Sequence, residues 1–495
     1  MRRLLLALLT AACATAPVAP PAAPVVQAPP PPAWVRTPPP EALPSAKVAA
    51  TAVTRKTLPN GVRLIVVEQH RRKVAIVNLL LPKGSLYDPP GDEGLTYMAV
   101  KLASDFHELG GARDENEKSF RMQVARLGGV TEFEVESDFS QIEISGYSQD
   151  IPTYLKLLSA ELHRPRHGAR SFHQRRNFTL DAVEDAESSD TASFRQLLNR
   201  TAFGPDHPYS AAPYGTVKGL SHLRLKDVES QQRFIFEPEG ATLLVVGDVQ
   251  PAEVIAKATE LLSDWKTHVD PDADVVPLPK VPRPSLPRDS KQIQYLARPT
   301  ASTMMTCATR PLPEVAATNA TLRVLVAVLG EGLESRLNQT LRNDNGLTYG
   351  ADAQVVRRRL ASALIACSAI DSSRAAEGTR LFREVLGSLK DKPPSDEEIA
   401  RAKGVVLSRI DSSMDDVQRS VDTWLLAIAY GDGSPHSEQE RAAVQAVKAS
   451  EVRDLAAKLF KLDNFRWVVS GDRAVAVKAF ESTGLGTLAQ AKPAK

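Results

Sequence analysis

The sequence predicts an α+β protein built from two similar domains. Each half of the chain begins with strand-like runs, continues through long amphipathic helices and ends on an apolar strand closed by Gly-Asp. The two closing strands cover residues 241–248 and 466–472. Because strands and helices alternate without a regular βαβ rhythm, we expect each domain to be a mostly antiparallel sheet covered by helices.

Length and composition set the class of protein. A chain of 495 residues is long enough for two or three domains with full cores. Its hydrophobic content of 43% and charged content of 24% are ordinary for a soluble globular protein. The formal net charge of +2 gives no reason to propose nucleic acid or an anionic surface as a partner.

The N-terminus has the pattern of a bacterial export signal. Arg2 and Arg3 precede a short apolar run, residues 4–12, that ends at Cys13. The run is too short to span a bilayer, which needs about 20 residues. It resembles a lipoprotein signal, so we expect Cys13 to be lipidated and the protein to be an outer-membrane lipoprotein facing the periplasm or the exterior. Secretion without a lipid is one alternative, and an uncleaved or wrongly assigned start is the other.

Proline-rich stretches divide the chain. We expect a signal at residues 1–13, a Pro/Ala-rich tether at 14–50, a first domain at 51–268, a Pro-rich linker at 269–290 and a second domain at 291–484. Cys307 and Cys367 lie in strand-like segments of the second half. Connectivity cannot be deduced from sequence, and we expect two buried free thiols.

A helix near the start of the first domain carries the most informative pattern. Gly94 and Leu95 open an amphipathic helix that resembles the G-L-x-H-x-x-E-H helix of the pitrilysin/insulinase family of zinc peptidases. In that family the histidines bind zinc and the glutamate is the general base. Here Tyr97, Val100 and Lys101 occupy these positions. Lysine has no free lone pair at neutral pH, valine moves no proton and tyrosine is a rare zinc ligand, so we expect no catalytic residue and no metal in this chain.

Other motifs follow in the family's order. They are the L-G-G turn at residues 127–129, the F-G-x-H-P-Y…G-T loop at 203–216, the Gly-Asp at 247–248 and the segment LGEGLESRLNQTLRNDNGLTYG at 329–350. The resemblance covers nearly the whole chain after about residue 54. It implies two domains that face each other across a cleft.

Few other residues suit a metal. The family's third ligand is a glutamate on a later helix, and the matching region, residues 172–187, offers Asp181, Glu184 or Asp185 in an uncertain register. We expect these to form a solvated acidic face. His107 with Glu108, and His163 with His167, are weak alternatives, because glycines follow the first pair and Pro165 interrupts the second.

The second half keeps a pair of residues that suit substrate binding. Arg342 and Tyr349 are seven residues apart, on either side of Asn345-Gly346-Leu347. In the resembling family an arginine and a tyrosine at this spacing bind the substrate backbone and help to stabilise the oxyanion. A guanidinium and a phenol are donors suited to both tasks. The alternative is a helix-ending arginine and a packed tyrosine.

These features together resemble the non-catalytic subunit of a two-subunit family peptidase. Such a chain is not an enzyme on its own: it binds an extended peptide and completes the active site of an H-x-x-E-H partner, which holds the zinc. A scaffold or complex-forming protein without a proteolytic role is one alternative, and an atypical zinc metallopeptidase acting alone is the other.

Overall fold

The computed structural model describes residues 52–103, 120–163, 168–266, 292–312, 319–431, 437–481 and 483–490. The predicted signal, tether and linker therefore lie outside the described residues, as do Cys13, His107, Glu108 and His167. The described residues all belong to one compact unit. Among the described residues, no helix combines the length and the apolar character that crossing a membrane requires.

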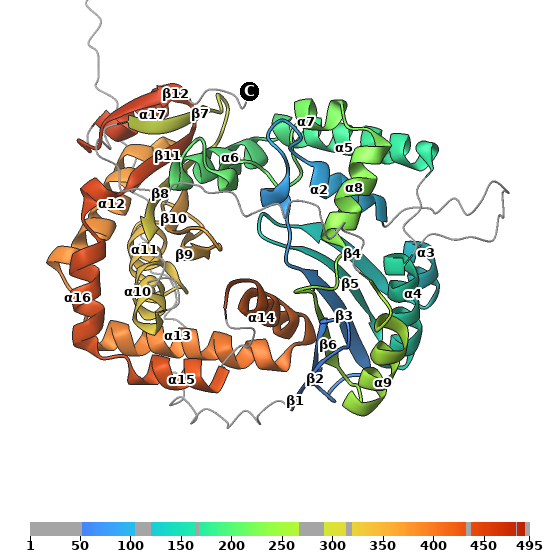
Figure 1. Cartoon of the computed structure of the whole chain (residues 1–495). Helices are drawn as coiled ribbons and strands as arrows, with labels where there is room; N and C mark the ends of the chain where they lie inside the picture. The colour runs from blue at the N-terminus through green and yellow to red at the C-terminus, as the bar shows by residue number, and fades with distance from the viewer. Residues whose placement is uncertain are drawn as a thin grey trace, which may run out of the picture. The chain divides into compact units, whose positions relative to one another are not determined.

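The first half contains a six-stranded sheet in the order β1-β2-β6-β3-β5-β4 (Figure 1). Only the β2–β6 pair is parallel. The strands are β1 (Val53–Thr57), β2 (Arg63–Glu68), β3 (Val74–Leu81), β4 (Val130–Val135), β5 (Ser140–Tyr147) and β6 (Thr242–Gly247). The helices are α2 (Leu95–Ala103), α3 (Phe120–Arg126), α4 (Ile151–His163), α5 (Ala169–Ser188), α6 (Asp190–Phe203), α7 (Val217–Ser221), α8 (Leu225–Ile235) and α9 (Pro251–Leu262).

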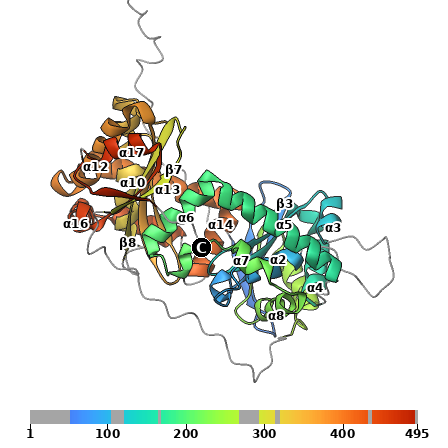
Figure 2. The same cartoon turned by 90° about the horizontal axis from the view of Figure 1, so that it is seen from above.

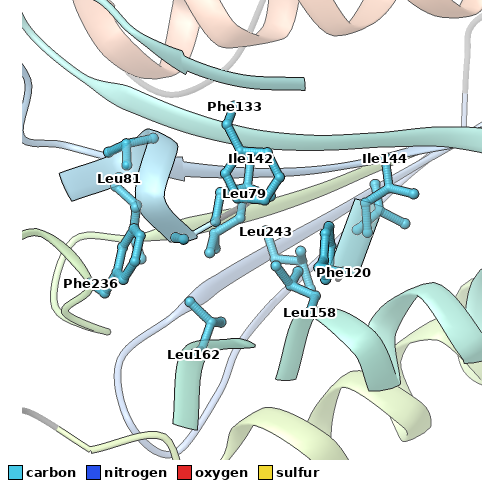
Figure 3. Packing of buried hydrophobic residues seen from close by; sticks show 14 of the residues in the cluster. Leu79, Leu81, Phe120, Phe133, Ile142, Ile144, Leu158, Leu162, Phe236 and Leu243 are labelled. Carbon is cyan, nitrogen blue, oxygen red and sulfur yellow. The ribbon is translucent and has the colours of Figure 1, made fainter. Parts of the chain in front are cut away.

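Alternation along the strands builds the first core. In β4 the residues Thr131, Phe133 and Val135 are buried, whereas Glu132 and Glu134 between them are exposed. The buried side chains meet apolar residues of α2, α4, α8 and α9 in one cluster. Figure 3 shows this packing, with strand residues such as Leu79 and Ile142 facing helix residues such as Leu158.

The second half contains a six-stranded sheet in the order β12-β7-β11-β8-β10-β9. Its strands are β7 (Gln292–Ala297), β8 (Thr303–Leu312), β9 (Ala351–Arg357), β10 (Ser362–Asp371), β11 (Arg466–Gly471) and β12 (Thr487–Gln490). The helices are α10 (Ala320–Gly330), α11 (Arg336–Asn338), α12 (Ala375–Asp391), α13 (Asp396–Asp415), α14 (Val417–Tyr430), α15 (Ser437–Ala446), α16 (Ala449–Leu459) and α17 (Arg473–Glu481). Side chains of α10, α12, α16 and α17 share its core.

The two sheets repeat one topology. The order β2-β6-β3-β5-β4 in the first half corresponds to β7-β11-β8-β10-β9 in the second, and β6 and β11 both end in the predicted Gly-Asp. The α+β prediction with two similar, mostly antiparallel domains is therefore confirmed. The outer strands differ, because β1 pairs with β2 in antiparallel fashion and β12 pairs with β7 in parallel. Strand β12 also lies beyond residue 484.

In each half of the chain, one helix packs on the sheet of the other half. Trp424 and neighbouring apolar residues of α14 pack on Ile65, Ile76 and Leu244 of the first sheet. Conversely, Leu197 of α6 packs on Cys307 and Val468 of the second. The halves are thus joined by apolar packing as well as by the chain.

The two cysteines of the second half correct the sequence-based expectation of free thiols. Cys307 of β8 and Cys367 of β10 are directly opposite each other in an antiparallel pair, with their Cα atoms 4.2 Å apart, and they form a disulfide. The prediction of two free thiols was wrong because only the register of the two strands brings the residues together.

The degenerate metal helix and a pocket in the second half

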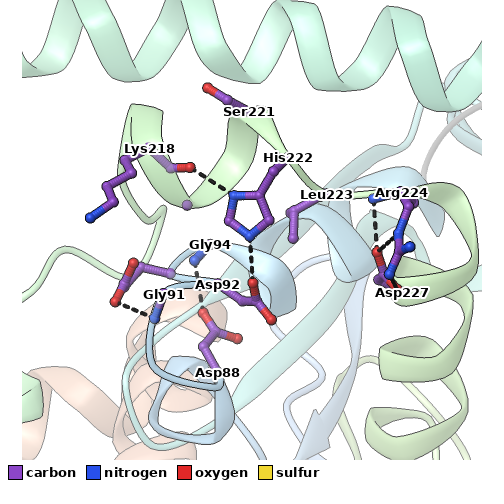
Figure 4. Close-up of polar contacts among 12 residues, drawn as sticks. Asp88, Gly91, Asp92, Gly94, Lys218, Ser221, His222, Leu223, Arg224 and Asp227 are labelled. Atoms are coloured by element: carbon purple, nitrogen blue, oxygen red, sulfur yellow. Dashed lines mark hydrogen bonds and ion pairs between the residues drawn. The ribbon is translucent and has the colours of Figure 1, made fainter.

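The N-terminus of α2 is held by one carboxylate. Asp88 accepts a hydrogen bond from Gly94 N–H through Oδ2 at 2.9 Å and from Thr96 N–H through Oδ1 at 2.8 Å (Figure 4). Gly94 directly precedes the helix and Thr96 is in its first turn, where N–H groups have no partner within the helix. Burial raises the pKa of Asp88 to about 6, against the lowering effect of these N–H donors.

A second polar contact joins the loop before α2 to α7. His222 Nε2 lies 2.7 Å from Asp92 Oδ1, and its Nδ1 lies 3.0 Å from the Lys218 carbonyl oxygen (Figure 4). Both ring nitrogens face acceptors, and the bond to Asp92 raises the pKa of His222. His222 is exposed and Asp92 is half-buried, and we assign the pair the role of tying α7 to this loop.

The structure accounts for each of the three degenerate positions on α2. Val100 is completely buried in the first core. The Lys101 ammonium donates a hydrogen bond to the Phe133 carbonyl oxygen of β4 and lies 5.2 Å from the centre of the Tyr97 ring. Burial lowers the pKa of Lys101 and raises that of Tyr97. These side chains serve packing and internal hydrogen bonding.

No carboxylate from α5 completes a metal site among the described residues. Helix α5 packs against α2, as the two views of Figures 1 and 2 show. The α5 charge that acts on both Tyr97 and Lys101 is that of Arg175. The three candidate ligands Asp181, Glu184 and Asp185 are exposed.

The histidines that were weak metal candidates are either paired with another residue or lie outside the described residues. His163 pairs with Asp264, at 3.0 Å between Nε2 and Oδ1. Within the described ranges, no group of three or more His, Cys, Asp or Glu side chains is arranged to hold an ion. The residues present therefore do not fit the zinc that the family resemblance implies for an active member.

The second half presents Arg342 on an unusual turn. Residues Gln339–Asp344 form a π-helical segment, and Gly346, two residues after its end, has φ +59°. Such segments are rare in proteins overall, and where they occur they often lie at functional sites. The Arg342 side chain is exposed, and within the described residues it makes no hydrogen bond or ion pair. Tyr349 is 96% exposed, which is exceptional for a tyrosine.

Two polar side chains hold this loop in place. Asn338 is buried; its Nδ2 donates to the carbonyl oxygens of Gly332 (3.0 Å) and Ala351 (2.8 Å), and its Oδ1 accepts from Ala351 N–H (2.8 Å). Thr348 Oγ1 lies 2.7 Å from the Ala369 carbonyl oxygen of β10. Sequence reasoning missed Asn338, because a single asparagine in a short helix carries no signal of this role.

A pocket lies beside the loop. Its volume is about 440 Å³. It is lined by Met305, Gly330, Gly332, Leu333, Asn338, Arg342, Gly350, Ala351, Asp352, Cys367, Ser368 and Ala369. Arg342 thus lines the pocket, whereas Tyr349 lies next to a lining residue and is not part of the wall. The loop that was predicted from sequence to bind substrate therefore adjoins a concave surface.

Comparisons with known proteins agree with these features. Residues 222–406 match the family model "Peptidase M16 inactive domain". The "Zinc protease PqqE" of Helicobacter pylori is 24% identical over 231 residues, which are 46% of this chain and 50% of that relative. The match thus spans half the length of this curated relative.

Two solved structures share the fold. A protease from Helicobacter pylori has a TM-score of 0.72 and 18% identity, with 85% of this chain and 99% of that chain covered. A peptidase M16 inactive domain from Pseudomonas fluorescens has a TM-score of 0.70 and 17% identity, with 90% and 100% covered.

Proposed function

Because the chain is a member of the peptidase M16 family, as its motifs predict, we propose that it is a non-catalytic subunit that binds an extended peptide and completes the active site of a zinc-bearing family partner. One combination carries the proposal. The metal helix is committed to packing, whereas the loop of Arg342 is exposed beside a pocket.

The packing of the degenerate metal helix α2 argues against independent peptidase chemistry. A zinc peptidase of this kind needs protein ligands for the metal and a carboxylate that takes a proton from the bound water. At the corresponding positions, Val100 is in the core and Lys101 donates to the Phe133 carbonyl oxygen. A protonated amine repels a cation, so this helix offers zinc neither ligand nor base.

The exposed loop of Arg342 supplies groups that act on a peptide. The guanidinium of Arg342 and the phenol of Tyr349 are both exposed donors. Donors of these kinds bind peptide carbonyl groups and stabilise negative charge that develops on them during hydrolysis. In the proposed heterodimer, the partner supplies the metal and the base, and this chain supplies Arg342 and Tyr349.

Mixing the purified chain with an H-x-x-E-H family chain from the same organism tests the proposal. Alone, this chain is expected to hold far less than one zinc per molecule after dialysis and to hydrolyse no peptide. Together, the two chains are expected to cleave a quenched-fluorescent peptide much faster than the partner alone. Stoichiometric zinc that is lost on Tyr97→Ala contradicts the proposal and favours an atypical metallopeptidase. A stable complex without a rate increase favours the scaffold.

We also propose the location. The export pattern before Cys13, followed by a Pro/Ala-rich stretch, supports a lipid-anchored protein of the bacterial cell envelope. A lipid anchor of this kind leaves the two domains on the outer side of the cytoplasmic membrane, where disulfides form and persist. The Cys307–Cys367 disulfide is compatible with such a compartment.

A further inference from the structure

The charges around the pocket are unevenly balanced. Arg409 Nε lies 2.5 Å from Glu331 Oε1. At Asp352, which lines the pocket, burial raises the pKa of the carboxyl group, and the Arg409 charge and the Ala353 N–H only oppose that change. Glu331 therefore has an ion-pair partner, and burial disfavours the charged form of Asp352. Arg342, at the loop, has no ion pair among the described residues. The group that is left to attract a ligand is a cation.

The neighbouring strand edge is already occupied. Strand β9 is the last strand of its sheet, so its outer edge would be open to an added peptide strand. Asn338, however, takes both the N–H and the C=O of Ala351, and the Ala353 N–H stabilises Asp352. Main-chain pairing of a peptide with Ala351 is therefore blocked, which leaves the side chains of the pocket as the recognising groups at this position.

The rest of the wall is mostly hydrocarbon. Met305, Leu333 and Ala369 supply apolar surface, and Leu333 is 58% exposed although it is a large apolar residue. Such surface suits an apolar side chain. The pocket thus offers one cation and one apolar wall close together.

We propose that this pocket binds a carboxylate of the peptide through the Arg342 guanidinium, with an apolar side chain next to that carboxylate against Leu333 and Met305. The carboxylate is either the free C-terminus or an acidic side chain. Arginine binds carboxylates with two parallel hydrogen bonds, which are stronger than bonds to a neutral amide. This inference rests on the proposed function, because it names the part of the peptide that the site recognises.

Three fluorescein-labelled peptides of one sequence test it by anisotropy with the purified full chain. The first ends in leucine with a free carboxylate, the second ends in leucine amide, and the third is the amide with glutamate before the leucine. We expect the first or the third to bind at least about tenfold more tightly than the second, since a charge-assisted hydrogen bond is worth about that factor. Which of the two binds identifies the source of the carboxylate.

Variants connect the preference to the pocket. Arg342→Gln is expected to abolish the preference, so that the peptides bind with about equal affinity. The control is Arg380→Gln, which changes an exposed arginine paired with Glu384 on α12 and is expected to leave the preference unchanged. Leu333→Glu is expected to weaken carboxylate binding more than Leu333→Gln does, and neither change at this exposed position disturbs the core. A thermal melt of each variant confirms folding.

Three results overturn the inference: equal affinity for all three peptides, a preference that survives both Arg342→Gln and Leu333→Glu, or no binding of any peptide at millimolar concentration. The assay contains no partner subunit. A preference for the carboxylate without any gain of partner activity would therefore reject the proposed function and support this inference. A gain of partner activity without a preference for the carboxylate would support the proposed function and reject this inference.

Discussion

The carboxylate that holds the first turn of α2 makes stability depend on pH in a direction opposite to most carboxylates. Burial raises the pKa of Asp88 from 3.8 to about 6, although the N–H groups of Gly94 and Thr96 oppose the change. One pKa unit corresponds to about 1.4 kcal/mol, so the folded protein binds this proton more tightly than the unfolded chain by about 3 kcal/mol. The contribution is fully present below pH 3.8 and is lost as the pH rises to about 6.

Asp88→Asn isolates this contribution. Urea unfolding of wild type and variant, followed by tryptophan fluorescence between pH 3.5 and pH 7.5, gives the difference in the free energy of unfolding at each pH. Because all other groups titrate in both proteins, the difference, wild type minus variant, is expected to fall by up to about 3 kcal/mol across the range. Most of the fall lies between pH 4 and pH 6.

A matched control is Asp227→Asn on α8. Its bond to Arg224 lowers the pKa of Asp227, so this carboxylate stabilises the fold above pH 3.8 and loses its effect as the pH falls. The corresponding difference is expected to rise with pH. If the Asp88 difference is flat or also rises, the N–H donors at the helix terminus outweigh burial and the reasoning is refuted.

Three further predictions concern other parts of the chain. Asn338→Ala removes the side chain that joins Gly332 to Ala351, so peptide affinity is expected to fall several-fold while the α-helical circular dichroism stays unchanged; unchanged affinity would show that the loop holds itself. Cys307→Ser with Cys367→Ser opens a link across a sequence separation of 60 residues and is expected to lower the free energy of unfolding by about 2–4 kcal/mol; maleimide labelling of the denatured, unreduced wild type that modifies both thiols would contradict the disulfide. Cys13→Ser is expected to move the protein from the membrane to the soluble fraction or to leave it unprocessed, and a wild-type protein without lipid mass would rule out the anchor.

The sequence predicted features that depend on local pattern. Alternation in β4, the closing strands before Asp248 and Asp472, and the apolar face of α2 all follow from residue spacing, so the two α+β domains were predictable. The family motifs also predicted that Tyr97, Val100 and Lys101 are no metal site and that Arg342 lies at a binding surface. The structure places Val100 in the core, leaves Tyr97 and Lys101 half-buried, and places Arg342 in the wall of the pocket.

Features that depend on distant segments escaped prediction. The disulfide requires that Cys307 and Cys367 share a register in paired strands, which no local pattern fixes. The role of Asn338 depends on its hydrogen bond to Ala351, a residue that lies 13 positions later and that the intervening loop places beside it. The balance of charges around Arg342 likewise depends on Arg409, which comes from α13.

The most direct test of the central claim is the rate of the two-chain peptidase with variants of this chain. The partner is saturated with wild type, Arg342→Ala or Tyr349→Phe, and complex formation and thermal melts are measured in parallel. Both side chains are exposed and outside the core, so the variants are expected to fold and assemble. Loss of one oxyanion donor typically lowers the rate by about 10²–10³, and we expect Arg342→Ala to approach this range. Full activity of both assembled variants would contradict the account and leave the chain a scaffold.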